Sequence, residues 1–287
     1  MKKIILVILL VGIAGIAGIV RSHSNPIRSL SRLPGVIHGD QQLAGDAREE
    51  IRKNYELSAG ASVEVSGING PVKIETADVK TADIFIERIG SSQEVLSRRK
   101  VTIDATATSL RIHGEKGDAS FFGRLFGSAP SERVTLRLPR QISLVAKGVN
   151  GSVVVGEIAG SVEVHGINGK VDIAQASGSA EFKGINGNIS LGLKQLDTHG
   201  IDLSGINGNI ELRLDSIVNA DLEAHGMNGN VTSDLPNVVV DKTKHGRYTA
   251  QIGNGGNSIS ASGINGNIRL TRMMTAATAP VESKSGS

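Results

Sequence analysis

A four-residue turn, Gly-(Ile/Val/Met)-Asn-Gly, recurs through this 287-residue chain. Its copies begin at Gly67, Gly148, Gly166, Gly184, Gly205, Gly226 and Gly263, and the five from Gly148 to Gly226 start 18, 18, 21 and 21 residues apart. Asn-Gly is the strongest short turn signal, because both residues tolerate positive φ. The period is too short for a separate domain and fits one coil of a stacked β structure.

The residues on both sides of each turn alternate between apolar and polar. The second and fourth positions before the first Gly are apolar in every copy, as in Val164 and Val162. The second position after the last Gly is always Val or Ile, and the fourth is apolar in every copy except the one with Ser233. Such alternation is typical of strands with one buried face.

These patterns predict an all-β fold. We expect a single-stranded β-solenoid, β-helix-like, with two short strands in each coil of 18–21 residues and parallel pairing between successive coils. An antiparallel meander of hairpins would show the same alternation. Equivalent residues recur coil after coil, which a meander does not require, and stacking is therefore favoured.

Composition agrees with a narrow core and excludes several classes of site. Aromatic residues make up 2% of the chain and Trp is absent, so the core must be built from small branched side chains. The absence of Cys excludes disulfides, thiol catalysis and cysteine metal sites. A net charge of +3 without clustered aromatics or a recognised motif does not indicate nucleic-acid binding.

The N-terminus has the pattern of an export signal. Lys2 and Lys3 precede an unbroken apolar run, Ile4 to Val20, in the order of a secretory signal. The run is at the lower limit for a membrane span, and no clear cleavage site follows it. Residues 1–22 are therefore expected to be a signal peptide or an N-terminal membrane anchor. The protein would lie in the periplasm, on the outer surface, or anchored facing outside the cytoplasm.

The rest of the chain divides by composition and repeat content. Residues 23–54, rich in Ser, Pro, Gly and Arg, are predicted to be a flexible linker, 55–272 the β-solenoid repeat domain, and 273–287 a disordered tail. The repeat domain contains a Phe-rich loop, 114–132, and an expected hairpin insertion, 234–257. In the loop, Phe121, Phe122 and Phe126 either cap the fold or form a tip that faces a membrane or partner. We favour the capping role.

The turns, the segment Thr135–Arg140 and the opening Glu50–Lys53 together resemble the bacterial putative adhesin family, a domain of unknown function with Gly-Ile-Asn-Gly repeats. The chain also resembles the related head GIN domain of putative autotransporter adhesins. The similarity covers roughly residues 50 to 272 and departs from the family pattern in the Phe-rich loop and the late hairpin. It implies a β-helix-like fold and an envelope or surface location, and it implies no ligand.

No group of residues has the pattern of a catalytic, cofactor or metal site. Gly253–Gly256 lacks the Lys and the helix of a phosphate loop, and His165 and His225 are expected to lie coils apart. The turn asparagines are expected to form stacked ladders that satisfy turn backbone groups, as is an outer row, Asn188, Asn209, Asn230 and Asn267. The turn residues are Asn69, Asn150, Asn168, Asn186, Asn207, Asn228 and Asn265.

Four acidic residues share one outward position in successive coils: Glu163, Glu181, Asp202 and Glu223. At a spacing of about 4.8 Å they would form a column of like charges. An ordinary solvated face is the simple interpretation, and a weak divalent-cation stripe is the alternative. Repulsion would raise the carboxyl pKa values, so that acid, calcium or Glu181→Gln would each stabilise the fold.

The sequence therefore favours an exported, non-catalytic scaffold, an adhesin or surface interaction protein of the bacterial envelope that binds a protein or a glycan. It would contact the membrane through its N-terminal segment if that segment is uncleaved, and no cofactor is expected. One alternative is a structural or regulatory envelope protein that acts through a protein partner. A β-helical polysaccharide-active enzyme is disfavoured, because carbohydrate sites usually present aromatic platforms and this chain has two Tyr and no Trp.

Overall fold

The computed structural model describes residues 47–115, 129–236 and 238–273. These residues form an all-β unit with one short helix. The elements are β1 (Ala47–Glu56), β2 (Ala61–Ser66), β3 (Val72–Ala77), β4 (Thr81–Gly90), α1 (Gln93–Arg98), β5 (Val101–Thr106), β6 (Ser109–Gly114), β7 (Ser131–Pro139), β8 (Ile142–Lys147), β9 (Val153–Ile158), β10 (Val162–His165), β11 (Val171–Ala176), β12 (Ala180–Lys183), β13 (Ile189–Leu193), β14 (Ile201–Asn207), β15 (Ile210–Leu214), β16 (Ala220–His225), β17 (Val231–Ser233), β18 (Val240–Lys244), β19 (Arg247–Ile252), β20 (Asn257–Asn265) and β21 (Ile268–Arg272).

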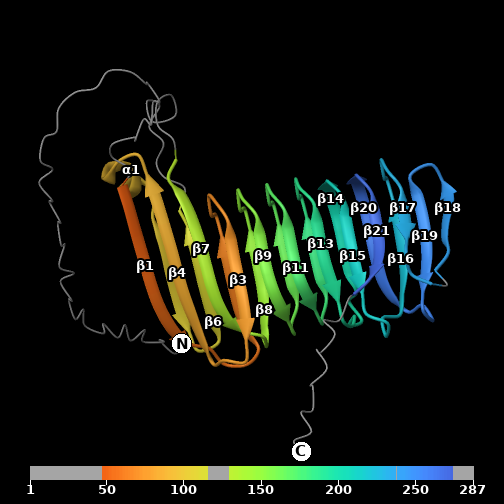
Figure 1. Cartoon of the computed structure of the whole chain (residues 1–287), viewed down its shortest axis with the longest axis horizontal. Coiled ribbons are helices and arrows are strands. Elements are labelled where there is room, and N and C mark those ends of the chain that lie inside the picture. Colours follow the sequence, from red (N-terminus) through yellow and green to blue (C-terminus); the bar gives the residue numbers. More distant parts are fainter. Residues whose placement is uncertain (1–46, 116–128, 237, 274–287) are drawn as a thin grey trace, which may run out of the picture. The chain divides into compact units, whose positions relative to one another are not determined.

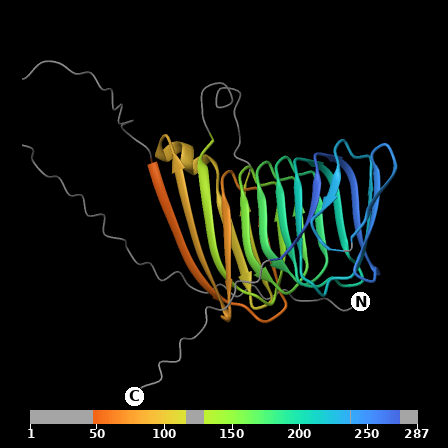
Figure 2. The ribbon, with the colours of Figure 1, turned by 45° about the vertical axis from the view of Figure 1, so that its right-hand side comes forward.

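The strands form two large sheets in which parallel pairs predominate (Figure 1). The 10-stranded sheet has the order β1-β4-β7-β3-β9-β11-β13-β15-β21-β17, and the 11-stranded sheet has the order β18-β19-β16-β20-β14-β12-β10-β8-β2-β6-β5. The two sheets face each other and are joined by loops along their edges (Figure 2). Each Gly-X-Asn-Gly turn connects a strand of the 11-stranded sheet to the next strand of the 10-stranded sheet. We call such a strand–turn–strand unit a rung.

Neighbouring rungs pair in parallel and in register. In the 11-stranded sheet Val164 pairs with Ala146 on one side and Phe182 on the other, and in the 10-stranded sheet Val171 pairs with Val153 and Ile189. The expected parallel pairing is confirmed by these registers. A hairpin meander would have paired Val164 with Val171, and that alternative is excluded.

The order of the rungs differs from the order of the sequence at both ends of the stack. The β2–β3 rung lies between the β6–β7 strands and the β8–β9 rung. The β20–β21 rung lies between the β14–β15 and β16–β17 rungs. The expectation that coils stack strictly in sequence order is therefore wrong at both ends. The strands β6 and β7, whose connection lacks the turn motif, lie outside the turn-bearing rungs, so all seven turns form one continuous row.

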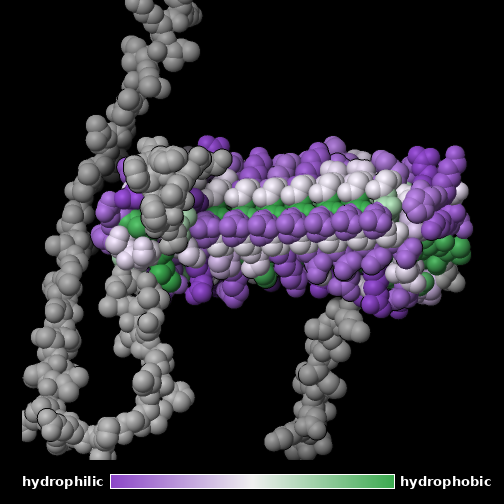
Figure 3. Space-filling view, turned by 90° about the horizontal axis from the view of Figure 1, so that it is seen from above, coloured by the Kyte–Doolittle hydropathy of each residue, from purple (hydrophilic) through white to green (hydrophobic). Residues whose placement is uncertain are grey.

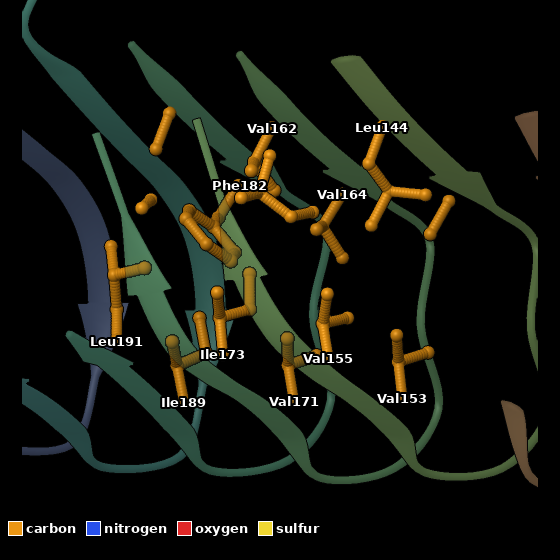
Figure 4. Close-up of a cluster of buried hydrophobic side chains, with 14 of the residues drawn as sticks. Leu144, Val153, Val155, Val162, Val164, Val171, Ile173, Phe182, Ile189 and Leu191 are labelled. Atoms are coloured by element: carbon orange, nitrogen blue, oxygen red, sulfur yellow. The ribbon is translucent and has the colours of Figure 1, made fainter. Parts of the chain in front are cut away.

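The core lies between the sheets and is built from the inward residues of each strand. Figure 4 shows Val162, Val164 and Phe182 from one sheet facing Val155, Val171 and Ile173 from the other. These side chains are at most 2% exposed. Phe182 is the bulkiest of the fully buried side chains in the described residues, and most of the others are Val, Ile, Leu and Ala, as the composition predicts.

Antiparallel strands extend the sheets at both ends. At one end β1 and β4 continue the 10-stranded sheet beyond β7, and β5 continues the other beyond β6. Here α1 buries Leu96. At the other end the hairpin β18–β19 pairs with β16 and buries Tyr248. Among the described residues, no helix is long and apolar enough to cross a membrane.

Some of the segments predicted from the sequence either overlap a strand of the structure or lie outside the described residues. β1 begins at Ala47, so the predicted linker 23–54 overlaps a regular strand, because Ile51 and Tyr55 alternate toward the core. Phe121, Phe122 and Phe126 lie outside the described residues, as do segment 1–22 and residues 274–287. The capping role of the three Phe residues therefore stays a prediction.

Candidate functional site

The turn edge of the stack carries an unbroken row of side-chain amides, the Asn ladder. Its spatial order is Asn69, Asn150, Asn168, Asn186, Asn207, Asn265 and Asn228. In each step the Nδ2 of one Asn donates to the Oδ1 of its neighbour, as from Asn186 to Asn168 over 3.1 Å. Seen from above, hydrophilic and pale rows run side by side along this edge (Figure 3).

The outer Asn row is bonded differently. Its order in space is Asn188, Asn209, Asn267 and Asn230, and the Oδ1 of each of the first three accepts from the backbone N of the next, at 2.9 to 3.0 Å. We expected both rows to satisfy turn backbone groups. Only the outer row bonds chiefly to backbone, because it lies one residue past the turn, where the next rung presents an N–H. Asparagines of the Asn ladder mainly bond one another.

The Asn69 end of the ladder is closed by a buried ion pair. Asn69 donates from Nδ2 to the Pro130 carbonyl at 2.8 Å and from its backbone N to Glu132 Oε2 at 3.0 Å. Arg99 Nε lies 2.7 Å from Glu132 Oε1, and Arg99 also donates to the Gly67 carbonyl. Residues 130–132 thus provide the hydrogen-bond acceptors for Asn69 on the side where the ladder has no further asparagine. Sequence reasoning missed this contact, since no local pattern joins residues so far apart.

A shallow groove of about 620 Å³ runs beside the outer Asn row on the exposed face of the 10-stranded sheet. It crosses four adjacent strands, β13, β15, β21 and β17, and reaches Lys170 just before β11. Its polar lining consists of the outer-row amides, the hydroxyls of Ser190 and Thr232, and the charged side chains of Lys170, Glu211 and Arg269. The four outer-row asparagines were identifiable from the sequence, but the groove was not, because its walls come from separate rungs.

Two of the three charged side chains in the groove, Lys170 and Arg269, are paired with opposite charges. Lys170 Nζ lies 2.8 Å from Asp172 Oδ2, and Arg269 Nε lies 2.8 Å from Asp234 Oδ2. Arg213, in the same sheet, donates to the Ile173 carbonyl at 2.9 Å and lies 3.5 Å from Asp172. The groove therefore offers amides, hydroxyls, two ion pairs and the Glu211 carboxylate, which accepts from Ser190 Oγ at 3.4 Å. Such a surface suits an extended, polar ligand without a large net charge.

The predicted column of four acids is wrong in its composition. Glu163 pairs with Glu181, and Glu181 with Asp202, but Asp202 is followed by Ser260, which then pairs with Glu223. The inserted β20 strand separates the fourth carboxylate from the other three. Lys183 Nζ also lies 2.6 Å from Glu181 Oε1 and 3.7 Å from Asp202 Oδ2.

The pKa of Glu181 moves in the direction opposite to our expectation. A hydrogen bond from Lys183 lowers the pKa of this carboxyl, against a smaller raising effect of burial, and the charges of Lys183 and His165 lower it further. A cation that lies along the same face outweighs the repulsion between neighbouring acids. His165 Nε2 is 3.2 Å from Glu181 Oε1, without hydrogen-bond alignment. His225 is farther along the row, beyond Lys183, Ser204 and Ser262.

Glu181→Gln is therefore expected to destabilise the fold, by less than about 1 kcal/mol since the pair is solvent-screened. Because the folded-state pKa of Glu181 is depressed, its contribution is present above the unfolded pKa and is lost as pH falls through the folded value. Urea unfolding at neutral and acidic pH would measure both effects. Glu163→Gln, at the same position one rung away, is the matched control. A gain in stability for Glu181→Gln would instead support the interpretation in which the neighbouring carboxylates repel one another.

Comparison with known proteins finds no matching family model and no matching curated protein. Among solved structures, a putative cell adhesion protein from Clostridium sporogenes is 16% identical, with 79% of this chain and 100% of that one covered and a TM-score of 0.38. A putative adhesin from Parabacteroides merdae is 9% identical, with coverages of 80% and 97% and a TM-score of 0.25. One from Bacteroides fragilis is 10% identical, with coverages of 77% and 97% and a TM-score of 0.29. At these values the similarities carry no argument about what this chain binds.

Proposed function

We propose that this chain is an exported, non-catalytic β-solenoid scaffold of the adhesin type, which displays a ligand-binding groove at the bacterial envelope. The proposed export rests on the charged and apolar order of residues 2–20. The proposed solenoid, with two strands in each coil of 18–21 residues, rests on the turn spacing together with the alternation of successive strands between the two sheets. The proposed family is the adhesin-like one whose turn motif the chain shares.

The groove beside the outer Asn row is the single observation that carries the binding role. It extends across four adjacent strands, so it fits a ligand that is itself extended. Its amides and hydroxyls can donate to and accept from the hydroxyl groups of a sugar chain, and strands of a sheet repeat them about every 4.8 Å. We therefore propose a linear glycan as the ligand. A protein partner, as in a structural or regulatory envelope role, is the alternative.

The test is to fill the groove without disturbing the core. Ser190 is half-buried and Thr232 is exposed, and both point outward into the groove, so Ser190→Arg with Thr232→Arg would occupy it. We expect the double variant to bind a linear envelope polysaccharide at least about tenfold more weakly, the effect of losing roughly 1.4 kcal/mol of contacts. Calorimetric titration of the purified protein with a panel of such polysaccharides measures this.

Ser260→Arg is the matched control, because it places the same side chain on the outer face of the other sheet, between Asp202 and Glu223. Its affinity should equal that of the unmodified protein. Equal weakening by both variants would place the binding site elsewhere. If no polysaccharide in the panel binds, a protein partner is the favoured ligand. Turnover of any glycan would support the enzyme interpretation that the composition disfavours.

A further inference from the structure

Each of the seven turns contains an Asn-Gly pair, the dipeptide most prone to spontaneous deamidation. The backbone nitrogen of the Gly attacks Cγ of the preceding Asn, and a new C–N bond forms. The bond between Cγ and Nδ2 breaks, and ammonia leaves. Water then opens the resulting cyclic imide to aspartate or isoaspartate. A following Gly makes the attack easy because it has no side chain to obstruct the nitrogen.

The rungs of Asn186 and Asn207, inside the stack, hold both reacting groups. Gly187 N donates to the Asn207 carbonyl at 3.0 Å, so the attacking nitrogen is already engaged. The Asn186 side chain is held on both sides, because its Nδ2 donates to Asn168 and its Oδ1 accepts from Asn207, each at 3.1 Å. Cγ can approach the nitrogen only after these bonds break. Asn207 and Gly208 are held in the same way, with Gly208 N donating to the Asn265 carbonyl at 3.0 Å.

Asn228 is the last member of the ladder and lacks this protection. Its Nδ2 donates to Asn265 Oδ1 at 3.0 Å. In the part of the chain that the structure describes, its Oδ1 accepts no hydrogen bond and Gly229 N donates none. The Tyr248 hydroxyl lies 2.9 Å from the Gly229 carbonyl and 3.1 Å from Asn230 Oδ1, and it bonds neither Asn228 Oδ1 nor Gly229 N. The Asn228 side chain is also exposed, so water can reach it.

The opposite end of the ladder provides a contrast. Asn69 is also a terminal residue, but its Nδ2 donates to the Pro130 carbonyl and its Oδ1 accepts from Asn150 at 2.9 Å. The buried Glu132 holds its backbone N. Among the described residues neither Gly70 N nor Gly229 N donates a hydrogen bond, so the attacking nitrogen is unbonded at both ends of the ladder. The ends differ in the side chain, because Asn69 is half-buried with its amide oxygen engaged, whereas Asn228 is exposed with its amide oxygen free.

We infer that Asn228 is the fastest-deamidating of the seven turn asparagines in the folded protein, with water as the co-reactant. The reaction has a structural consequence at this end of the stack. A carboxylate at position 228 cannot donate to Asn265 Oδ1. Isoaspartate adds a backbone atom between β16 and β17, which breaks their register with β20 and β21. The end rung and the hairpin that packs on it are loosened.

The experiment follows all seven sites in one sample. The full-length protein is incubated in mildly alkaline buffer and digested, and the conversion of each Asn is measured by mass spectrometry of the peptides. We expect Asn228 to react about tenfold faster than Asn186 and Asn207, since two hydrogen bonds of ordinary net strength are missing. Asn69 is the terminal control and should react more slowly than Asn228. Equal rates at Asn228 and Asn207 would overturn the proposal.

Two further measurements separate structure from local sequence. In urea the seven sites should react at similar rates, and a bias toward Asn228 that persists there would assign it to sequence context and overturn the inference. Asn265→Ala removes the donor to Asn207 Oδ1, so Asn207 should react severalfold faster in that variant while Asn168, bonded as before, keeps its rate. An unchanged rate at Asn207 would show that the amide bonds give no protection. A rise at Asn168 would show that the stack itself has opened.

Discussion

Glu132→Ala is expected to lower the free energy of unfolding by about 3–5 kcal/mol, the cost of leaving a buried charge without its partner. The Glu132 side chain is fully buried and that of Arg99 is only 14% exposed. Without the carboxylate, Arg99 keeps the Gly67 carbonyl as an acceptor but has lost its countercharge, and the backbone N–H of Asn69 loses its acceptor. Both losses fall on the first turn of the Asn ladder, so the end of the stack should open first.

Urea unfolding of the purified protein measures this loss. Glu132→Gln keeps an acceptor for Asn69 but not the charge, and it should lie between the native protein and Glu132→Ala. Glu94→Ala is the matched control, because Glu94 pairs with Arg98 on the exposed face of α1 and should cost less than about 1 kcal/mol. If Glu132→Ala were no more damaging than Glu94→Ala, the buried pair would have no role in closing the stack.

Phe182→Ala should cost about 3–5 kcal/mol, the range for truncating a fully buried Phe. Phe182 lies in the narrow space between the sheets, with Val164 and Leu203 beside it on the adjacent strands and Ile173 on the opposite sheet (Figure 4). Parallel hydrogen bonds hold β12 on both sides, so neighbouring strands cannot move in to fill the cavity. The full cost of the truncation should therefore appear in the free energy of unfolding.

Thermal and urea unfolding of Phe182→Ala and Phe182→Leu test this expectation, and the Leu variant should lose less than the Ala variant because it fills more of the space. Val154→Ala, on the outer face where the side chain is 40% exposed, is the control and should stay within about 0.5 kcal/mol of the native protein. A Phe182→Ala cost close to that of Val154→Ala would mean that the core is loosely packed around this site.

Much of the candidate site could be predicted from local patterns, because it repeats once in every rung. The Asn at the third position of each turn and the Asn after the last Gly in four copies are enough to identify the two amide rows. Their bonding could not be predicted. Whether an amide meets another amide or a backbone N–H depends on the position of the next rung, as Asn168 and Asn188 show.

The sequence by itself determined the alternating strands, the turns between them and the parallel register, because these depend on side-chain period and backbone freedom within about ten residues. Only the tertiary structure decided the order of the rungs. Ile201, Leu222 and Ile259 are equivalent inward residues, so β14 could pair with β16 or β20 equally well by local pattern. The hairpin β18–β19 covers the far side of β16 and leaves β20 the inner place. That choice put Ser260 between Asp202 and Glu223, and it made Asn228, which is not the last turn in the sequence, the last residue of the ladder.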